Sequence, residues 1–337
     1  MRVLGALLAT VVVLGGIGAI YQSVGYWLDS RRFPQRGRSF WVESIKLNLN
    51  CTGEGGPLVV LDSGLGGSSL DWLRVQRGIA KFTRVCSYDR AGYGWSDPSP
   101  MPRTSLQIAT ELRELLASAE ERGPYLLVGH SFGGYNVRMF AKLYPSDVAG
   151  MVLVDAEHPD EEMRQKRLQD ALPALVKKSI ENNEERTKVW DRITQPIKLY
   201  LGVDRLKVAL GGVYSPSFPR DFQEEILFLE QQPKYIKAVE AEDKLDDQSA
   251  AQVRAAGSLG DRPLIVLTAG IPYAGDPSDT VLTEAQKKSR DNLWISELQT
   301  QYAHLSSRGK QVVVGDSSHE MVAAVREVWG LVDLHSP

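Results

Sequence analysis

The sequence is poor in the features that mark nucleic-acid binding, metal binding and disulfide-rich folds. Its 337 residues carry a formal net charge of −3, whereas a nucleic-acid-binding face needs a marked basic excess. Its two cysteines, Cys51 and Cys86, are too few for a disulfide framework, and their spacing matches no metal motif. We expect two buried thiols; the alternative, a single disulfide, requires an oxidising compartment. Repeats of solenoid length are also missing, which favours a globular protein. The charge and the cysteine spacing favour one without nucleic-acid or metal partners.

Charge is missing from the first part of the chain as well. Residues 3–20 form an uncharged apolar run, close in length to the roughly 20 residues that a membrane-spanning helix needs. Tyr21, Tyr26 and Trp27 follow and suit a lipid interface, and arginines recur between positions 31 and 38. We expect an uncleaved N-terminal membrane anchor, with a cleaved signal peptide and a secreted protein as the alternative. The arginines favour a cytoplasmic location for the rest of the chain, whereas a signal peptide would export it, so the side of the membrane stays open.

The remainder of the chain alternates between short apolar runs and helical patterns. This alternation predicts an α/β fold with a mostly parallel, twisted sheet and helices on both faces. The expected strands lie in residues 57–64, 83–92, 125–129, 150–155, 263–270 and 311–315. Charged helical patterns fill the chain between Asp155 and Pro263, so we expect a helical cap inserted between two strands of the core. The predicted divisions are an anchor and linker at 1–38, core at 39–155, the cap at 156–262 and further core at 263–337.

One pentapeptide carries a specific chemical prediction. Gly129-His130-Ser131-Phe132-Gly133 stands between an expected strand and an expected helix, which is the context of a nucleophile elbow. The glycines permit a sharp turn that lifts the Ser131 side chain above the edge of the sheet. The turn also places the amide of Phe132 at a helix N-terminus, where the helix dipole favours an oxyanion. The alternative is a glycine-rich packing turn without catalysis.

Four segments together resemble the α/β-hydrolase family. They are 62–67 (DSGLGG), 88–97 (YDRAGYGWSD), 129–134 (GHSFGG) and Ser318-His319, and the resemblance runs from about residue 40 to the C-terminus. More closely, the chain is similar to a group of bacterial membrane-anchored hydrolases of uncertain substrate. The resemblance implies an α/β-hydrolase fold with an inserted helical cap and without a metal or organic cofactor. A serine in the nucleophile position argues against epoxide hydrolysis and dehalogenation, for which the family uses an aspartate.

Of the five histidines, His319 is the predicted base. It follows the last expected strand by a short loop, and the chain order nucleophile, acid, histidine is that of the α/β-hydrolases. Its imidazole can accept the Ser131 proton and return it to the leaving group. His158 is a minor alternative, with a polar residue at the entrance of the cap as its simpler interpretation.

Three aspartates remain candidates for the acid that orients His319. Asp155 ends an expected strand, where catalytic groups gather in open α/β sheets, and some branches of the family, haloalkane dehalogenases among them, carry their acid there. Most of the family carries it after the next-to-last strand, where this chain has Tyr273, with Asp276 and Asp279 nearby. We favour Asp155 and keep Asp276, then Asp279, as alternatives.

The loop DSGLGGSS (62–69) is the expected oxyanion loop. Its glycines allow the N–H of Leu65 to turn inward, so that Leu65 and Phe132 would supply two donors to a tetrahedral oxyanion. Most of the family has His-Gly where this loop has Ser-Gly. The loop lacks the GK[ST] ending of a phosphate-binding P-loop, which excludes that function. The charged residues of the 88–97 segment are expected to brace the loop beside the site.

These residues together predict a serine hydrolase. Ser131 would attack an acyl carbonyl of a small molecule with a carboxylic ester-type bond, and water would release the acyl-enzyme. A peptidase or an acyltransferase could use the same triad. From a different class, a ligand-binding or receptor-like protein could keep the pocket with little turnover. The expected partners are the acyl substrate and a membrane through residues 3–20, with no metal and no organic cofactor.

Overall fold

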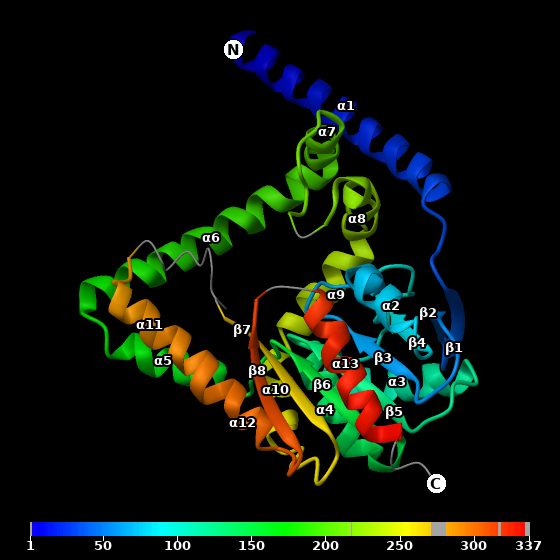
Figure 1. Cartoon of the computed structure of the whole chain (residues 1–337). Coiled ribbons are helices and arrows are strands. Elements are labelled where there is room, and N and C mark those ends of the chain that lie inside the picture. The colour runs from blue at the N-terminus through cyan, green and yellow to red at the C-terminus, as the bar shows by residue number, and fades with distance from the viewer. Residues whose placement is uncertain (1, 217, 271–280, 316–317, 334–337) are drawn as a thin grey trace. The chain divides into compact units, whose positions relative to one another are not determined.

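The computed structural model describes residues 2–216, 218–270, 281–315 and 318–333 (Figure 1). The chain divides into two compact units. The sheet unit comprises Arg36–Lys177 and Lys237–Pro337, and the α1 unit comprises Met1–Gln35 and Lys178–Ile236. The boundaries given above for the core and the cap stay predictions.

An eight-stranded sheet forms the centre of the described part of the sheet unit. Its strands are β1 (Arg38–Val42), β2 (Ile45–Thr52), β3 (Val59–Asp62), β4 (Val85–Tyr88), β5 (Tyr125–His130), β6 (Val148–Val154), β7 (Leu264–Ala269) and β8 (Gly309–Val314). They lie in the order β1-β2-β4-β3-β5-β6-β7-β8. The pairs β1–β2 and β2–β4 are antiparallel, and every other pair is parallel. The predicted mostly parallel sheet is therefore confirmed.

Helices cover both faces of this sheet (Figure 1). They include α2 (Leu73–Ile79), α3 (Ser105–Ser118), α4 (Gly133–Leu143) and α13 (Ser318–Asp333). Side chains alternate along the strands, so Val60 and Leu127 pack in one core cluster with α3 and α4. Val59 and Val128 pack in the other, with α2 and α13. All residues of β3 and β4 are buried, which explains why these strands appear in the sequence as continuous apolar runs.

Helices fill the chain between β6 and β7, as the charged patterns predict. They are α5 (Glu161–Asp170), α6 (Ala174–Leu201), α7 (Val203–Ala209), the short η3 (Arg220–Phe222), α8 (Gln223–Glu230), α9 (Pro233–Asp243) and α10 (Asp246–Arg254). After β7, α11 (Glu284–Asn292), the π-helical segment η5 (Leu293–Leu298) and α12 (Gln299–Ala303) lead into β8.

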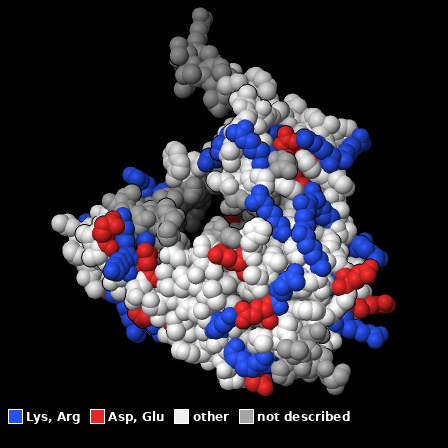
Figure 2. All heavy atoms as spheres, in the orientation of Figure 1, with Lys and Arg blue, Asp and Glu red and all other residues white. Residues whose placement is uncertain are grey.

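Charged side chains of both signs are mixed on the molecular surface. On the face drawn in Figure 2, Lys and Arg lie interspersed with Asp and Glu, with uncharged areas between them. Some of them form surface ion pairs, such as Arg254–Asp160 at 2.7 Å and Lys310–Glu327 at 2.7 Å. Exposed pairs contribute only about 0 to 1 kcal/mol each, so burial in the two core clusters is the larger source of stability.

A 31-residue helix, α1 (Arg2–Arg32), dominates the α1 unit. The rings of Tyr26 and Phe33 lie 5.3 and 6.1 Å from the ring of Phe228 on α8. Among the residues that the structure describes, no helix combines the length and the apolar character needed to cross a bilayer. The anchor predicted over residues 3–20 is thus not supported, and the location of the protein stays a prediction.

Cys51 and Cys86 form a disulfide, so the expectation of two buried thiols is wrong. The two residues face each other in the antiparallel register of β2 and β4, with Cα atoms 4.1 Å apart. Sequence spacing could not show this, because the pairing of β2 with β4 brings together residues that are 35 positions apart. The bond ties the antiparallel edge of the sheet to its parallel centre.

The disulfide predicts a measurable loss of stability when it is removed. Cross-linking positions 35 residues apart restricts the unfolded chain, so the double variant Cys51→Ala/Cys86→Ala should lose about 3 to 4 kcal/mol of unfolding free energy. Urea unfolding of the variant and of the oxidised and reduced parent protein measures this loss. Two thiols that react with maleimide in the unfolded, unreduced parent would contradict the bond.

Candidate active site

Ser131 lies in a strained turn between β5 and α4. Its φ is +50°, in the left-handed region that residues with a side chain rarely adopt. Three backbone hydrogen bonds hold it there: its N–H donates to Val154 O (3.2 Å), and its C=O accepts from the N–H groups of Gly134 (2.8 Å) and Glu157 (3.1 Å). Strain that is held in place by its surroundings is typical of functional residues, and this is the sharp turn that the pentapeptide predicts.

Close packing explains why glycines surround Ser131. A Cβ added at Gly129 would lie 2.5 Å from the carbonyl oxygen of Gly133, and one added at Gly133 would lie 2.4 Å from the carbonyl oxygen of Asp62. A Cβ at Gly134 would lie 2.5 Å from the Cβ of Ala156. No real Cβ makes contacts this short, so the approach of α4 to β3, β5 and β6 requires glycine at all three positions.

The loop after β3 passes directly beside Ser131. A Cβ added at Gly64 would lie 3.1 Å from the Cβ of Ser131 and 3.5 Å from its Oγ. Leu65 follows in the same loop, and Phe132 follows Ser131 at the start of α4. Among the described residues, neither the N–H of Leu65 nor that of Phe132 has a hydrogen-bond acceptor. Both predicted oxyanion donors therefore belong to segments next to the Ser131 hydroxyl, and neither N–H donates a hydrogen bond to a described residue.

Buried Arg90 fixes the direction of this loop. Its Nη1 donates to the carbonyl oxygen of Ser63 (2.6 Å) and to Asp62 Oδ1 (2.9 Å), and its Nη2 donates to the carbonyl oxygen of Gly64 (2.8 Å). The C=O of Gly64 and the N–H of Leu65 belong to one peptide unit, and in a trans peptide they point in opposite directions. Because Arg90 holds the carbonyl, the N–H of Leu65 points away from Arg90. The predicted bracing role of the 88–97 segment agrees with these contacts.

The charge of Arg90 is balanced by two buried carboxylates. Asp62 supplies one, and burial raises the pKa of that carboxyl to about 6 while the guanidinium of Arg90 opposes the rise. Glu242 on α9 supplies the other, with its two oxygens 3.0 Å from Nε and 2.9 Å from Nη2 of Arg90. Glu242 also accepts a hydrogen bond from the hydroxyl of Tyr93 (2.7 Å).

Glu242 is a residue that the sequence analysis missed. It lies in a charged run that suggests a solvent-exposed helix face, yet its side chain is completely buried. Nothing in the local pattern distinguishes it from its exposed neighbours, because its partner Arg90 is 152 residues away in sequence.

Asp155 follows the carboxyl end of β6 and is also strained, with φ +42°. Its Oδ1 accepts from the indole Nε1 of Trp294 (2.8 Å) and from the N–H of Ala269 (3.1 Å). Both bonds engage the same oxygen, which leaves Oδ2 for a further donor. A carboxylate that is fixed through one oxygen is suited to orient an imidazole with the other. Trp294 was not among the predicted site residues.

The structure does not join the predicted triad through hydrogen bonds. His319 lies in the first turn of α13, and its side chain is exposed. In the part of the chain that the structure describes, no hydrogen bond connects His319 to Ser131 or to Asp155. The alternative acids Asp276 and Asp279 lie outside the described residues. The identity of base and acid thus stays a prediction.

His158, the minor alternative for the base, is a buried structural residue. Its Nδ1 accepts from the N–H of Asp160 (3.2 Å), and its ring lies 4.7 Å from that of Tyr302. Burial lowers its pKa to about 4, and nearby guanidinium groups, that of Arg138 first, act in the same direction while Asp160 opposes them. His158 is therefore neutral at pH 7.

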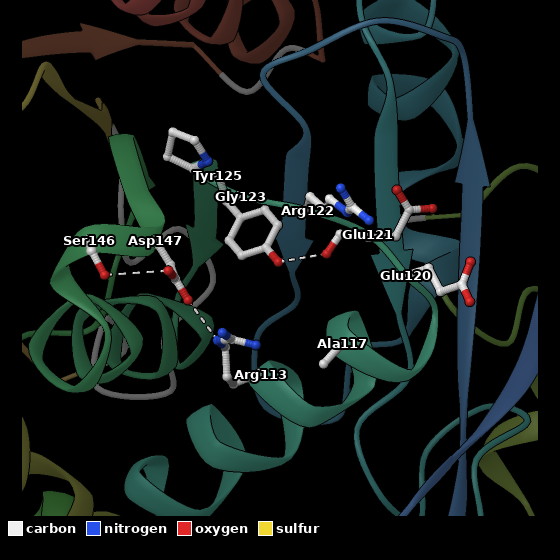
Figure 3. Close-up of a pocket in the computed structure, with 10 residues that line it drawn as sticks. Arg113, Ala117, Glu120, Glu121, Arg122, Gly123, Tyr125, Ser146 and Asp147 are labelled. Atoms are coloured by element: carbon white, nitrogen blue, oxygen red, sulfur yellow. Dashed lines mark hydrogen bonds and ion pairs between the residues drawn. The ribbon is translucent and has the colours of Figure 1, made fainter.

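A separate pocket lies around Tyr125 (Figure 3). It has a volume of about 530 Å³ and is lined by residues around Tyr125, at the amino end of β5. Its side chains bond among themselves: Arg113 to Asp147 (2.6 Å), and the Tyr125 hydroxyl to the carbonyl oxygen of Glu121 (2.8 Å). Ser131 follows the other end of β5, so this pocket is not part of the site around Ser131.

Comparison with known proteins gives a family match over most of the chain. The model described as "Alpha/beta hydrolase family" matches residues 59–328. The uncharacterized protein YqjL of Bacillus subtilis is 34% identical over 125 residues, which cover 35% of this chain and 49% of YqjL. An AB hydrolase superfamily protein of Gibberella zeae is 32% identical over 104 residues, 30% of this chain and 32% of that protein. The chain matches less than half of the length of the first curated relatives.

Solved structures show the same fold along nearly the whole chain. A thermophilic esterase from Thermogutta terrifontis has a TM-score of 0.50 at 19% identity, covering 90% of this chain and all (100%) of that one. A serine hydrolase involved in carbazole degradation has a TM-score of 0.55 at 14% identity, covering 87% of this chain and 98% of that one. At these identities the likeness shows the fold alone.

His158 predicts a specific pH dependence of stability. Its folded pKa of about 4 lies below its ordinary value of 6.5, so the unfolded chain binds a proton in this range and the folded chain does not. His158 thus contributes stability above pH 6.5 that is lost as the pH falls towards 4. Urea unfolding gives the free energy of unfolding at pH 7 and at about pH 4.5. Between these two pH values, this free energy should fall by about 2 to 3 kcal/mol less in His158→Asn than in the parent protein. The exposed His304→Asn serves as control, and an equal loss in all three proteins would contradict the assignment.

Proposed function

The chain belongs to the α/β-hydrolase family, and from this premise we propose that it is a serine hydrolase that cleaves a carboxylic ester-type bond. The observation that carries the proposal is the strained turn at Ser131, with the backbone of Gly64 beside its hydroxyl. A packing turn alone would need the glycines but neither the strained serine nor two unused amide donors in adjacent segments.

In the proposed reaction, Ser131 Oγ attacks the acyl carbonyl carbon and its proton moves to His319. The π electrons of the carbonyl move onto its oxygen, and the N–H groups of Leu65 and Phe132 stabilise the oxyanion that forms. The carbon–oxygen bond to the leaving alcohol then breaks, and His319 gives its proton to that alcohol. Water attacks the acyl-enzyme through the same steps and restores Ser131.

Asp155 is the proposed orienting acid. The bonds from Trp294 and Ala269 hold one carboxylate oxygen, and the other is available to accept from the His319 imidazole and to stabilise the imidazolium. Asp276 remains the alternative, and no step other than the orientation of His319 depends on which of them acts.

The disulfide supports a proposal for the compartment. Disulfides persist in oxidising surroundings and are rare in the cytosol, so the Cys51–Cys86 bond favours a sheet unit exported from the cytoplasm. A fusion reporter that is active only outside the cytoplasm, placed after the last residue, would test this location.

A fluorophosphonate probe tests the nucleophile. It should label the folded protein at Ser131 and leave Ser131→Ala unlabelled, and that variant should lose ester hydrolysis by on the order of 10⁶-fold. Ser118→Ala, which removes an exposed hydroxyl bonded to the carbonyl oxygen of Trp41, is the matched control. A panel of esters with graded acyl length gives the activity.

Each outcome of this experiment decides something. Folded protein that does not react with the probe would overturn the proposal in favour of a ligand-binding protein. Labelling without ester turnover, but with acyl transfer to an added amine or alcohol, would identify an acyltransferase, and turnover of peptides alone would identify a peptidase.

Paired substitutions test the acid. Asp155→Asn keeps the acceptor oxygen for Trp294 and Ala269 but cannot stabilise an imidazolium, so kcat should fall by up to about 10⁴-fold with little change in stability. Asp147→Asn, which breaks a surface ion pair with Arg113, should leave kcat unchanged. If Asp276→Asn lowers kcat and Asp155→Asn does not, the acid is Asp276; if neither lowers it, the proposed triad is wrong.

A further inference from the structure

The face of α1 that packs within the α1 unit carries small and polar residues beside the aromatic ring of Tyr26. It contains Gly18, Gln22, Gly25 and Asp29, whose spacing places them on one side of a helix. A Cβ added at Gly18 would lie 2.9 Å from the Cα of Leu201, so the backbones of α1 and α6 approach closely. The absence of a side chain at Gly18 permits this contact, and a Cβ added at Gly25 would lie 2.5 Å from Nε of Arg205 on α7.

Polar bonds hold α1 to its neighbours in the unit. Arg205 on α7 forms an ion pair with the buried Asp29. The Nε of Arg205 also donates to Gln22 Oε1 (3.0 Å). Gln22 Nε2 in turn donates to Gln231 Oε1 (2.9 Å). Buried polar groups of this kind need partners, and these contacts supply them for the groups named, while Nη2 of Arg205 has none among the described residues.

The outward face of α1 is apolar. The exposed residues are Val12, Val13, Leu14, Ile17, Ile20, Val24, Trp27 and Leu28, each with half or more of its surface accessible. Figure 2 shows this stretch of α1 without charged side chains. A helix in water normally turns its apolar residues inward, whereas α1 exposes these apolar side chains.

A second exposed apolar face adjoins it. Trp190, Ile193, Ile197 and Tyr200 recur along α6 at intervals of three and four residues, and Leu206 and Leu210 continue on α7. We call these six residues the α6–α7 stripe; all are more than half exposed, Trp190 at 64% and Tyr200 at 69%. The stripe meets α1 at Gly202, where an added Cβ would lie 2.9 Å from Tyr21 Cδ1.

We propose that the α1 unit binds the surface of a lipid bilayer through the outer face of α1 and the α6–α7 stripe. Helices with apolar residues outward and small or polar residues at their mutual contacts are typical of lipid surroundings. Trp and Tyr, which the stripe carries, are the side chains enriched where lipid meets water. The proposal extends the lipid contact from the N-terminal run to residues 190–210 of the inserted helices, and it does not depend on the reaction at Ser131.

A fluorescent label on α6 tests this proposal in the full-length protein. The native cysteines are joined in a disulfide, so Ile197→Cys introduces one reactive thiol in the stripe. Gln195→Cys is the matched control: it is also exposed, but it lies two residues away and about 160° around the helix. Each variant carries an environment-sensitive dye and is mixed with vesicles of phosphatidylcholine and phosphatidylglycerol.

The proposal expects the two labels to differ. With vesicles, the label at position 197 should shift its emission to the blue, lose iodide quenching several-fold and be quenched by spin-labelled lipid, while the label at 195 stays accessible to iodide. Equal accessibility at both positions on bound vesicles would overturn the proposal and leave attachment to α1 alone. Protection at 197 without vesicles, rising with protein concentration, would also overturn it and indicate a second copy of the chain as the occupant.

Discussion

The guanidinium of Arg90 is the interaction on which the geometry of the site depends. A buried cation is tolerated only with paired anions and filled hydrogen bonds, and Asp62, Glu242 and two loop carbonyls meet that requirement. The same contacts determine which way the peptide before Leu65 faces. Removal of either carboxylate would leave charge unbalanced in the interior, on the same guanidinium that holds the two loop carbonyls.

The residues around Ser131 show what local sequence can predict. The apolar runs at β3, β5 and β6 predict buried strands of a mostly parallel sheet, and the glycines at 129, 133 and 134 predict the sharp turn, because both depend on near neighbours in the chain. Three of the features that were wrong or missed are long-range. The Cys51–Cys86 bond, the pairing of Glu242 with Arg90 and the bond from Trp294 to Asp155 join residues from 35 to 152 positions apart.

The α1 helix illustrates a different limit. Its apolar run predicts lipid contact, but hydropathy treats all sides of a helix alike. The structure distinguishes the sides: Gln22 and Asp29 are bonded within the unit, while the apolar side chains point outward. The sequence therefore suggests the surroundings of α1, and the contacts within the unit, those of Arg205 among them, show which of its faces is packed against protein.

The π-helical segment η5 has a consequence for the residues after β6. Three consecutive residues there are held by three side chains of one helical run: Trp294 bonds Asp155, Gln299 bonds the carbonyl oxygen of Ala156 (2.6 Å), and Tyr302 bonds that of Glu157. In an α-helix, positions 294 and 299 would be about 140° apart, whereas the wider π turn brings residues five apart towards one side. The π turn thus places the side chains of this helical run opposite the residues that they bond. Positions four apart in an α-helix lie only about 40° from each other, so the π turn lets this segment hold one additional residue while Trp294 and Gln299 keep their bonds to the residues after β6.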